Sequence, residues 1–349
     1  MALFAGVYTV AGVLRAVVYT YVLQTVVLLV GSAVLCGIVL SRFDFSWTQI
    51  RDSVGADHLS LVQPLDDPAM PWLGLLIGVP VLGFYYWTMN QYVAQRILGA
   101  RNLEQATKGA LLAAALKLLP LVLMVLPGAL AASLFVDLER GDQVFPMLVR
   151  ELAPVGLAGL ILSGLMAAIM SSVDSALNSA STLITVDFVR PRRPHMSARA
   201  QAGLGRWITL GLMVFAALWA PMIDRFPGLF NYLQQGFAYV TPPLVAVFLL
   251  GRFWPQLGSV AAFRAVVLGH VISAALFAAA QWGWHAVHFT IVAGALCLVT
   301  AALAVGLQLL RGVHTLALAD DLTPPQAPAL KRMAWGLVGA VVIMVLAFW

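Results

Sequence analysis

Seven small or polar residues of the apolar stretch 156–186 fall on one helical stripe. At 3.6 residues per turn, the stripe contains Ala168, Ser171, Ser172, Ser175, Asn178, Ser179 and Thr182. Lipid cannot hydrogen-bond such groups, so they must face other helices, water or an ion. A small hard cation binds hydroxyl and carbonyl oxygens, but the same residue types also let membrane helices pack closely. The stripe therefore predicts either half of an ion site or a helix-packing face.

Two charged residues lie within otherwise apolar stretches. A lysine such as Lys117 costs about 2.5–3.5 kcal/mol at the centre of a membrane helix, so it should face a cavity or a partner. The alternative is that its long side chain reaches the headgroups at the nearby end of the span. Asp174 is the only acid deep within a span. It could bind a cation, form a structural salt bridge or be a protonated, hydrogen-bonded carboxyl.

An aromatic cluster, Tyr85, Tyr86 and Trp87, precedes two amides, Asn90 and Gln91. Aromatic belts of membrane proteins lie at the ends of spans. This cluster lies deeper within its apolar stretch. That position favours a surface on which a sugar or another organic solute stacks.

The elements that must position these residues are membrane-spanning helices. Of the 349 residues, 61% are hydrophobic and only 10% are charged, whereas a soluble domain is nearer 25% charged. The composition predicts an all-α integral membrane protein, and no pattern of short alternating strands is present. We expect nine spans, near 16–40, 72–96, 107–135, 156–186, 204–222, 229–251, 259–281, 286–310 and 331–349.

The basic residues indicate orientation rather than an acidic partner. Of the 20 Lys and Arg, 14 lie in connections on the same side as Arg15. The positive-inside rule places that side in the cytoplasm and the C-terminal Trp349 outside. We expect no nucleic-acid partner. The two cysteines, Cys36 and Cys297, lie in apolar helices, and no nucleophile–base pair or metal motif is present, so we do not expect an enzyme.

Two of the expected spans are interrupted. The span 72–96 contains several glycines and Pro80, and the span 229–251 contains Gln234 and the sequence Thr241-Pro242-Pro243. Such breaks free backbone carbonyls and occur where helices line a cavity, although simple proline kinks are an alternative. Between the spans, the sequence predicts a surface helix at 145–152 and an irregular linker at 190–199.

Several stretches resemble the sodium/solute symporter family, in its sodium–glucose cotransporter branch. These are 12–20, 86–96, 116–120, 170–187 and 232–250. The resemblance covers essentially the whole chain and implies a LeuT-type fold of two inverted repeats. It also implies that the first four core helices have no counterpart here, so that the transporter's N-terminal segment is missing. The segments expected are a helix remnant at 1–15, a transporter core at 16–251 and C-terminal flanking helices at 252–349.

The resemblance also implies the site residues. Sodium ligands are expected at the Ala168 carbonyl, Ser171 and Ser172, with a second sodium site of some members at Asp174 and Ser175. Solute-binding residues are expected at Lys117, Gln234, Tyr86, Trp87, Asn90 and Gln91, with Tyr86 as the inner gate. Two positions depart from the family: Tyr21 stands where many members have an aspartate, and Gly83 where some sugar transporters have a polar ligand.

The function so implied is sodium-coupled symport of a sugar or related polyol across a bacterial inner membrane. The solute alternatives are a carboxylate, a nucleoside, inositol or an amino acid. A further alternative is that this chain alone is a non-transporting remnant or membrane partner.

Overall fold

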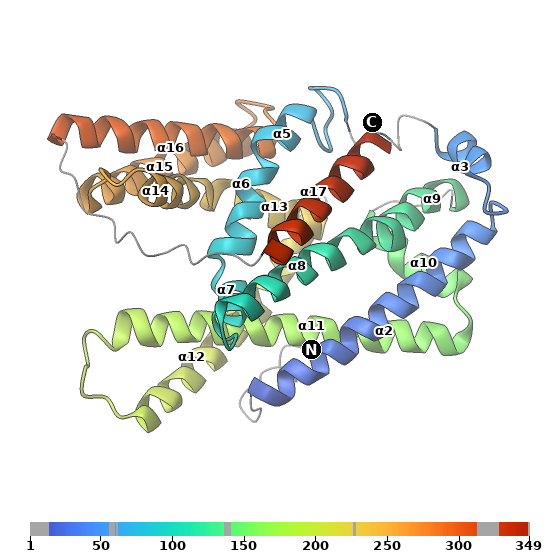
Figure 1. The fold of residues 1–349 in the computed structure, drawn as a ribbon, viewed down its shortest axis with the longest axis horizontal. Coiled ribbons are helices and arrows are strands. Elements are labelled where there is room, and N and C mark those ends of the chain that lie inside the picture. Colours follow the sequence, from blue (N-terminus) through green and yellow to red (C-terminus); the bar gives the residue numbers. More distant parts are fainter. Residues whose placement is uncertain are drawn as a thin grey trace. The chain divides into compact units, whose positions relative to one another are not determined.

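The chain is all-helical in the parts that the structure describes. The computed structural model describes residues 14–55, 60, 62–135, 141–225, 228–312 and 328–347. Within these ranges the only strand-like pairing is an isolated bridge between Gln63 and Pro71. In this part of the chain, eight helices are long and apolar enough to cross a membrane, and a bent pair of helices can be counted as a ninth span. Figure 1 shows the helices. The predicted all-α membrane fold is confirmed, and the candidate spans number eight, or nine if the bent pair is counted as one span, against the nine expected.

The helices gather into two compact units. The first unit combines residues 1–59 with 115–229, and the second combines 60–114 with 230–349. Both units are therefore built from chain segments that are far apart in the sequence. The predicted division into 1–15, 16–251 and 252–349 follows the family resemblance and stays a prediction.

The first unit has an apolar core where α2 meets α9, α10 and α11. Its elements are α2 (Leu14–Ser41), α3 (Trp47–Val54), the end of α8 (Leu103–Pro120), η2 (Leu121–Val125), α9 (Leu126–Leu134), η3 (Gly141–Gln143), α10 (Val144–Leu152), α11 (Val155–Leu183), η4 (Ile184–Val189), α12 (Ala198–Trp219) and η5 (Ala220–Arg225). The core includes Val39, Leu130, Leu148 and Ile161. Burial of Leu148 and Val149 on one side of α10 confirms the predicted amphipathic helix. Residues 190–197 are turns and irregular chain, as predicted.

The second unit is organised around α16. Its elements are α5 (Trp72–Ile77), α6 (Val79–Phe84), η1 (Tyr85–Met89), α7 (Gln91–Leu98), the first part of α8, α13 (Leu229–Val240) from Phe230, α14 (Pro242–Phe253), α15 (Ser259–Gln281), α16 (Phe289–Arg311) and α17 (Pro328–Ala347). Helix α16 packs against α5, α6, α14 and α15. The approach is close: a Cβ on Gly78 would lie 1.8 Å from the backbone oxygen of Thr290. Glycine is therefore required at this crossing.

Both predicted breaks are present. The span 72–96 is divided into α5, α6, η1 and α7. The second break separates α13 from α14, with a bend of 48°. Proline has no N–H, so Pro242 and Pro243 cannot complete the hydrogen-bond ladder.

At the second break the freed carbonyls are bonded by side chains rather than open to a cavity. The Val240 carbonyl lies 3.0 Å from Nε2 of His270, and the Tyr239 carbonyl accepts from the hydroxyl of Ser273. His270 and Ser273, both on α15, are thus the side chains that lie at the carbonyls of the bend.

A half-buried histidine caps the N-terminus of α16. Nδ1 of His288 accepts from the backbone N–H of Thr290 at 3.4 Å and lies 2.7 Å from the Thr290 hydroxyl. Burial lowers the pKa of His288, while the Asp67 carboxylate and the backbone of Ala69 act in the opposite direction. The neutral ring, which can accept at Nδ1, is therefore the form that suits this cap.

Candidate functional site

The oxygen-rich segment lies in the C-terminal half of α11, which begins directly after Pro154. Its residues do not share one environment. Ser175 and Ser179 are buried, Ala168 and Ser171 are half-buried, and Ser172 is exposed. The predicted stripe is therefore wider than the face that α11 packs against other helices of the first unit.

Three hydroxyl groups and two carbonyls form a linked cluster on this segment. The Ser171 hydroxyl donates to the Ala168 carbonyl at 3.1 Å, and the Ser175 hydroxyl donates to the Ser171 carbonyl at 2.8 Å. The Tyr21 hydroxyl of α2 lies 2.9 Å from the Ser175 hydroxyl and 3.1 Å from the Ser171 carbonyl. The cluster thus joins two helices whose residues are 150 or more positions apart.

Tyr21 is the residue of this cluster that sequence reasoning did not include among the site residues. It was noted only as a departure from the family pattern. The available signal was a phenol within the apolar span 16–40, because a tyrosine hydroxyl in a membrane interior requires a hydrogen-bond partner.

The chemistry of the cluster suits a hard cation. When Ser171 donates its only hydroxyl hydrogen to Ala168, both lone pairs of its oxygen stay available to a ligand. The ligand types are hydroxyl and carbonyl oxygens, which hard cations prefer over nitrogen and sulfur. Asp174, at 7% exposure, is a buried acidic group one residue from Ser175.

The aromatic residues predicted to contact solute lie on η1 in the second unit. Tyr86 contacts Trp87 edge-to-face, with ring centroids 5.5 Å apart and an interplanar angle of 81°. Its hydroxyl is hydrogen-bonded to that of Tyr92. Trp87 is 40% exposed, and both rings belong to the π-helical turn η1.

The two amides next to this cluster differ in role. Asn90 caps α7, its Oδ1 accepting from the backbone N–H of Tyr92 at 3.1 Å, so it has a structural function whether or not it binds solute. Gln91 is the first residue of α7 and is half-buried. Gln234 is half-buried on α13, where the Tyr85–Phe237 ring contact, 6.0 Å between centroids, joins η1 to that helix.

Lys117 belongs to the first unit, whereas Gln234 and the aromatic cluster belong to the second. The Lys117 side chain is exposed on α8 and makes no hydrogen bond or ion pair with the described residues. The structure thus brings Ala168, Ser171 and Ser175 together, and separately Tyr86 and Trp87. A joint site of Lys117 and Gln234 stays a prediction.

Comparison with known proteins places these residues in a family context. The family model described as the sodium:solute symporter family matches residues 1–269. The chain is 36% identical to sodium/myo-inositol cotransporter 2 of Rattus norvegicus over 299 residues, which cover 76% of this chain and 44% of that protein. It is 34% identical to sodium/glucose cotransporter 1 of Oryctolagus cuniculus over 307 residues, covering 76% of this chain and 46% of that protein.

A longer match is to a sodium/mannose cotransporter of Bos taurus, with 31% identity over 386 residues, 96% of this chain and 62% of that protein. The chain therefore spans about half the length of the curated relatives that it matches. The family model covers well over half of the chain, and its range includes both the α11 cluster and the aromatic residues of η1. The chain belongs to the sodium:solute symporter family.

Proposed function

We propose that the complete transporter couples the entry of sodium to the uptake of a sugar or related polyol. The observation that carries the proposal is the cluster of hydroxyl and carbonyl oxygens on α11, fixed to α2 by Tyr21. The printed names of the relatives, which pair sodium with myo-inositol, glucose or mannose, support the same assignment.

Sodium, a co-transported substrate, would bind the Ala168 carbonyl and the hydroxyls of Ser171 and Ser172. Asp174 and Ser175 would complete a second sodium site. A sodium ion that binds one conformation more tightly than another shifts the population toward that conformation. If the solute also binds that conformation more tightly, sodium raises the solute affinity, and linkage requires that the solute raises the sodium affinity by the same factor. The α11 cluster can therefore couple ion and solute without touching the solute.

The solute would hydrogen-bond to Lys117 and Gln234, above Tyr86, with Trp87, Asn90 and Gln91 beside it. An ammonium and amides donate to hydroxyl oxygens, and aromatic rings pack against the C–H faces of a sugar ring. Transport rather than catalysis is the role proposed for this site.

We further propose that the protein lies in a bacterial inner membrane with its C-terminus outside. Of the 20 Lys and Arg, 14 lie on the opposite side, which supports this orientation. The transporter would include further N-terminal helices that supply the other sodium ligands, since the chain covers 44% of its myo-inositol-transporting relative.

Uptake of radiolabelled myo-inositol, glucose and mannose into proteoliposomes tests the proposal. Uptake should require an inward sodium gradient, and Ser172→Ala should raise the half-saturating sodium concentration. Ser163→Ala is the matched control, because among the described residues this exposed hydroxyl of α11 bonds only to the Leu160 carbonyl of its own helix. Uptake that is unchanged by sodium would overturn the proposal.

The solute panel also decides among the alternative substrates. Competition by a carboxylate, a nucleoside or an amino acid, with none by sugars, would keep the sodium coupling and change the solute. The 349-residue chain alone is expected to show no sodium-driven uptake, and measurable uptake by it would contradict the proposed need for further helices.

A further inference from the structure

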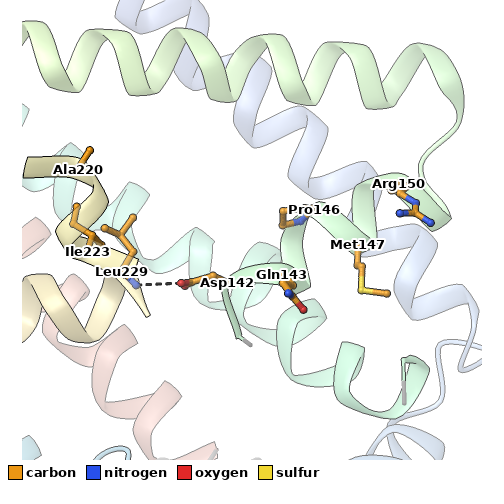
Figure 2. Close-up of a pocket in the computed structure, with 8 residues that line it drawn as sticks. All are labelled: Asp142, Gln143, Pro146, Met147, Arg150, Ala220, Ile223 and Leu229. Carbon is orange, nitrogen blue, oxygen red and sulfur yellow. Dashed lines mark hydrogen bonds between the residues drawn. The ribbon is translucent and has the colours of Figure 1, made fainter. Parts of the chain in front are cut away.

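The first unit contains a cavity whose lining includes no residue of the α11 oxygen cluster. Its volume is about 680 Å³, within the range usual for small-molecule sites. Figure 2 shows its walls, which come from η3, α10, η5 and the first residue of α13. The lining residues are Asp142, Gln143, Pro146, Met147, Arg150, Ala220, Ile223 and Leu229.

One wall of the cavity is held in place by a long-range hydrogen bond. Oδ2 of Asp142 accepts from the backbone N–H of Leu229 at 3.1 Å, drawn as a dashed line in Figure 2. A Cβ on Gly228 would lie 3.3 Å from the same oxygen, so glycine lets the chain approach the carboxylate. This bond satisfies one of the N–H groups that a helix start leaves without a partner. It also fixes the position of the Asp142 carboxylate.

Three polar groups of the lining have hydrogen-bonding capacity to spare. Oδ1 of Asp142 and the Gln143 amide have no hydrogen-bond partner among the described residues. Arg150 forms an ion pair through Nε with Glu151 at 2.9 Å, and its terminal nitrogens have no further partner in the described part of the chain. The lining thus includes an acceptor, an amide and a donor.

The rest of the lining is apolar. Pro146, Met147, Ile223 and Leu229 supply aliphatic and thioether surface. Asp142 and Arg150 carry opposite charges, so the cavity has no strong preference for an anion or a cation. Polar groups that both donate and accept, beside an apolar wall, match a neutral solute with several hydroxyl groups on a carbon ring.

We propose that this cavity is a second binding site for a neutral polyhydroxylated solute and that it does not require sodium. The choice of solute class rests on the proposed function. Asp142 accepts from solute hydroxyls, Gln143 and Arg150 donate to them, and Met147 with Ile223 packs against the C–H face. Asp142 and Arg150 are exposed, so the bound solute exchanges freely with water and the affinity is low, on the order of 1–10 mM.

Protection of an introduced cysteine tests the proposal with the 349-residue chain in lipid nanodiscs. Cys36 and Cys297, the two native cysteines, are replaced by alanine, and Met147→Cys is introduced. The rate of labelling by a water-soluble maleimide is measured in sodium-free choline buffer with myo-inositol, mannose or glucose. At a solute concentration equal to the dissociation constant, half of the sites are filled and the rate falls about twofold.

Two position controls accompany the cavity variant. Ala220→Cys, also in the lining but without a proposed contact to the solute, should be protected in the same way, which covers the case that Met147→Cys does not fold. Val155→Cys should not be protected, because this residue is 92% exposed at the start of α11 and does not line the cavity. Gln143→Leu in the Met147→Cys background should abolish protection without filling the cavity.

The outcomes separate this site from the proposed transport function. Protection in sodium-free buffer supports the site even if the complete transporter shows no sodium-driven uptake. Absence of protection at both cavity positions, in a protein whose complete form does transport, overturns it. Equal protection by glycine betaine, which has no hydroxyl groups, or protection by lactate alone also overturns the assigned solute class.

Discussion

Removal of the Tyr21 hydroxyl is the sharpest perturbation of the α11 cluster. Tyr21→Phe keeps the ring and deletes only the oxygen that lies 2.9 Å from the Ser175 hydroxyl and 3.1 Å from the Ser171 carbonyl. If Tyr21 is a positioning residue for the sodium ligands, the mutation should weaken sodium binding while leaving every proposed ligand in place.

The expected magnitude follows from the value of a hydrogen bond between membrane helices. Such bonds average about 0.6 kcal/mol and reach about 1.7 kcal/mol. Because about 1.4 kcal/mol corresponds to a tenfold change in an equilibrium constant, the half-saturating sodium concentration should rise roughly three- to twenty-fold. The maximal uptake rate should change little, since the hydroxyl that is removed bonds to Ser171 and Ser175 of α11, which are not proposed solute ligands.

Sodium titrations of uptake by the complete transporter measure this effect. Thr25→Val is the matched control, because its hydroxyl on the same helix bonds only to the Tyr21 carbonyl, at 2.8 Å. A double-mutant cycle of Tyr21→Phe with Ser175→Ala should be non-additive, since both mutations remove the same bond. A sodium half-saturation within twofold of wild type for Tyr21→Phe would refute the reasoning, whatever happens to thermal stability.

Three further predictions test the second unit and the solute site. Gly78→Ala should destabilise the protein by about 1–3 kcal/mol or more, because the new methyl group meets the Thr290 backbone. Gly83→Ala is the control and should not destabilise it, because nothing lies within 4 Å of the new methyl group. Thermal unfolding in detergent compares the two variants, and equal unfolding midpoints would contradict the close crossing of α16 at Gly78. His288 has a pKa lowered by burial, so its contribution to stability is complete above about pH 6.5 and is lost as the pH falls through the folded-state pKa. His288→Asn keeps a capping group but should lose this pH dependence, and an unchanged profile would show that another group causes it. Lys117→Gln should raise the solute Michaelis constant about ten- to hundredfold by loss of a charged hydrogen bond, with the sodium half-saturation unchanged; a rise in the sodium value alone would place Lys117 in the ion site instead.

The sequence predicts the membrane fold well because hydropathy is a local property. Each of the nine expected spans has a helix or helix pair in the structure, and both breaks occur at the predicted glycines and prolines. These features depend on residues within a single span, so periodicity and proline chemistry are enough to find them.

Contacts between helices are harder to predict from the sequence. The bond between Tyr21 and Ser175 joins residues 154 positions apart, and no periodic pattern indicates which helices will meet. The bend at Pro242 was predicted, but the use of His270 and Ser273 to bond its carbonyls depends on how α15 packs. The family resemblance names Ala168, Ser171 and Ser172 through related sequences rather than through geometry, and their role as sodium ligands stays a prediction.

The π-turns have a consequence for the helical phase of this protein. In η1, η2 and η4 the hydrogen bonds run from residue i to i+5, so each turn contains one residue more than an α-turn. One extra residue rotates the rest of a helix by about 100° relative to an uninterrupted α-helix. A helical-wheel projection that starts at Lys117 in α8 and continues beyond Val125 at 3.6 residues per turn therefore assigns the residues of α9 to the wrong faces. By the same geometry, the deletion of one residue within η2 can be absorbed by conversion of the π-turn to an α-turn. Helix α9 then keeps the orientation that buries Leu130. A deletion in the regular part of α11 would instead turn its serines away from Tyr21.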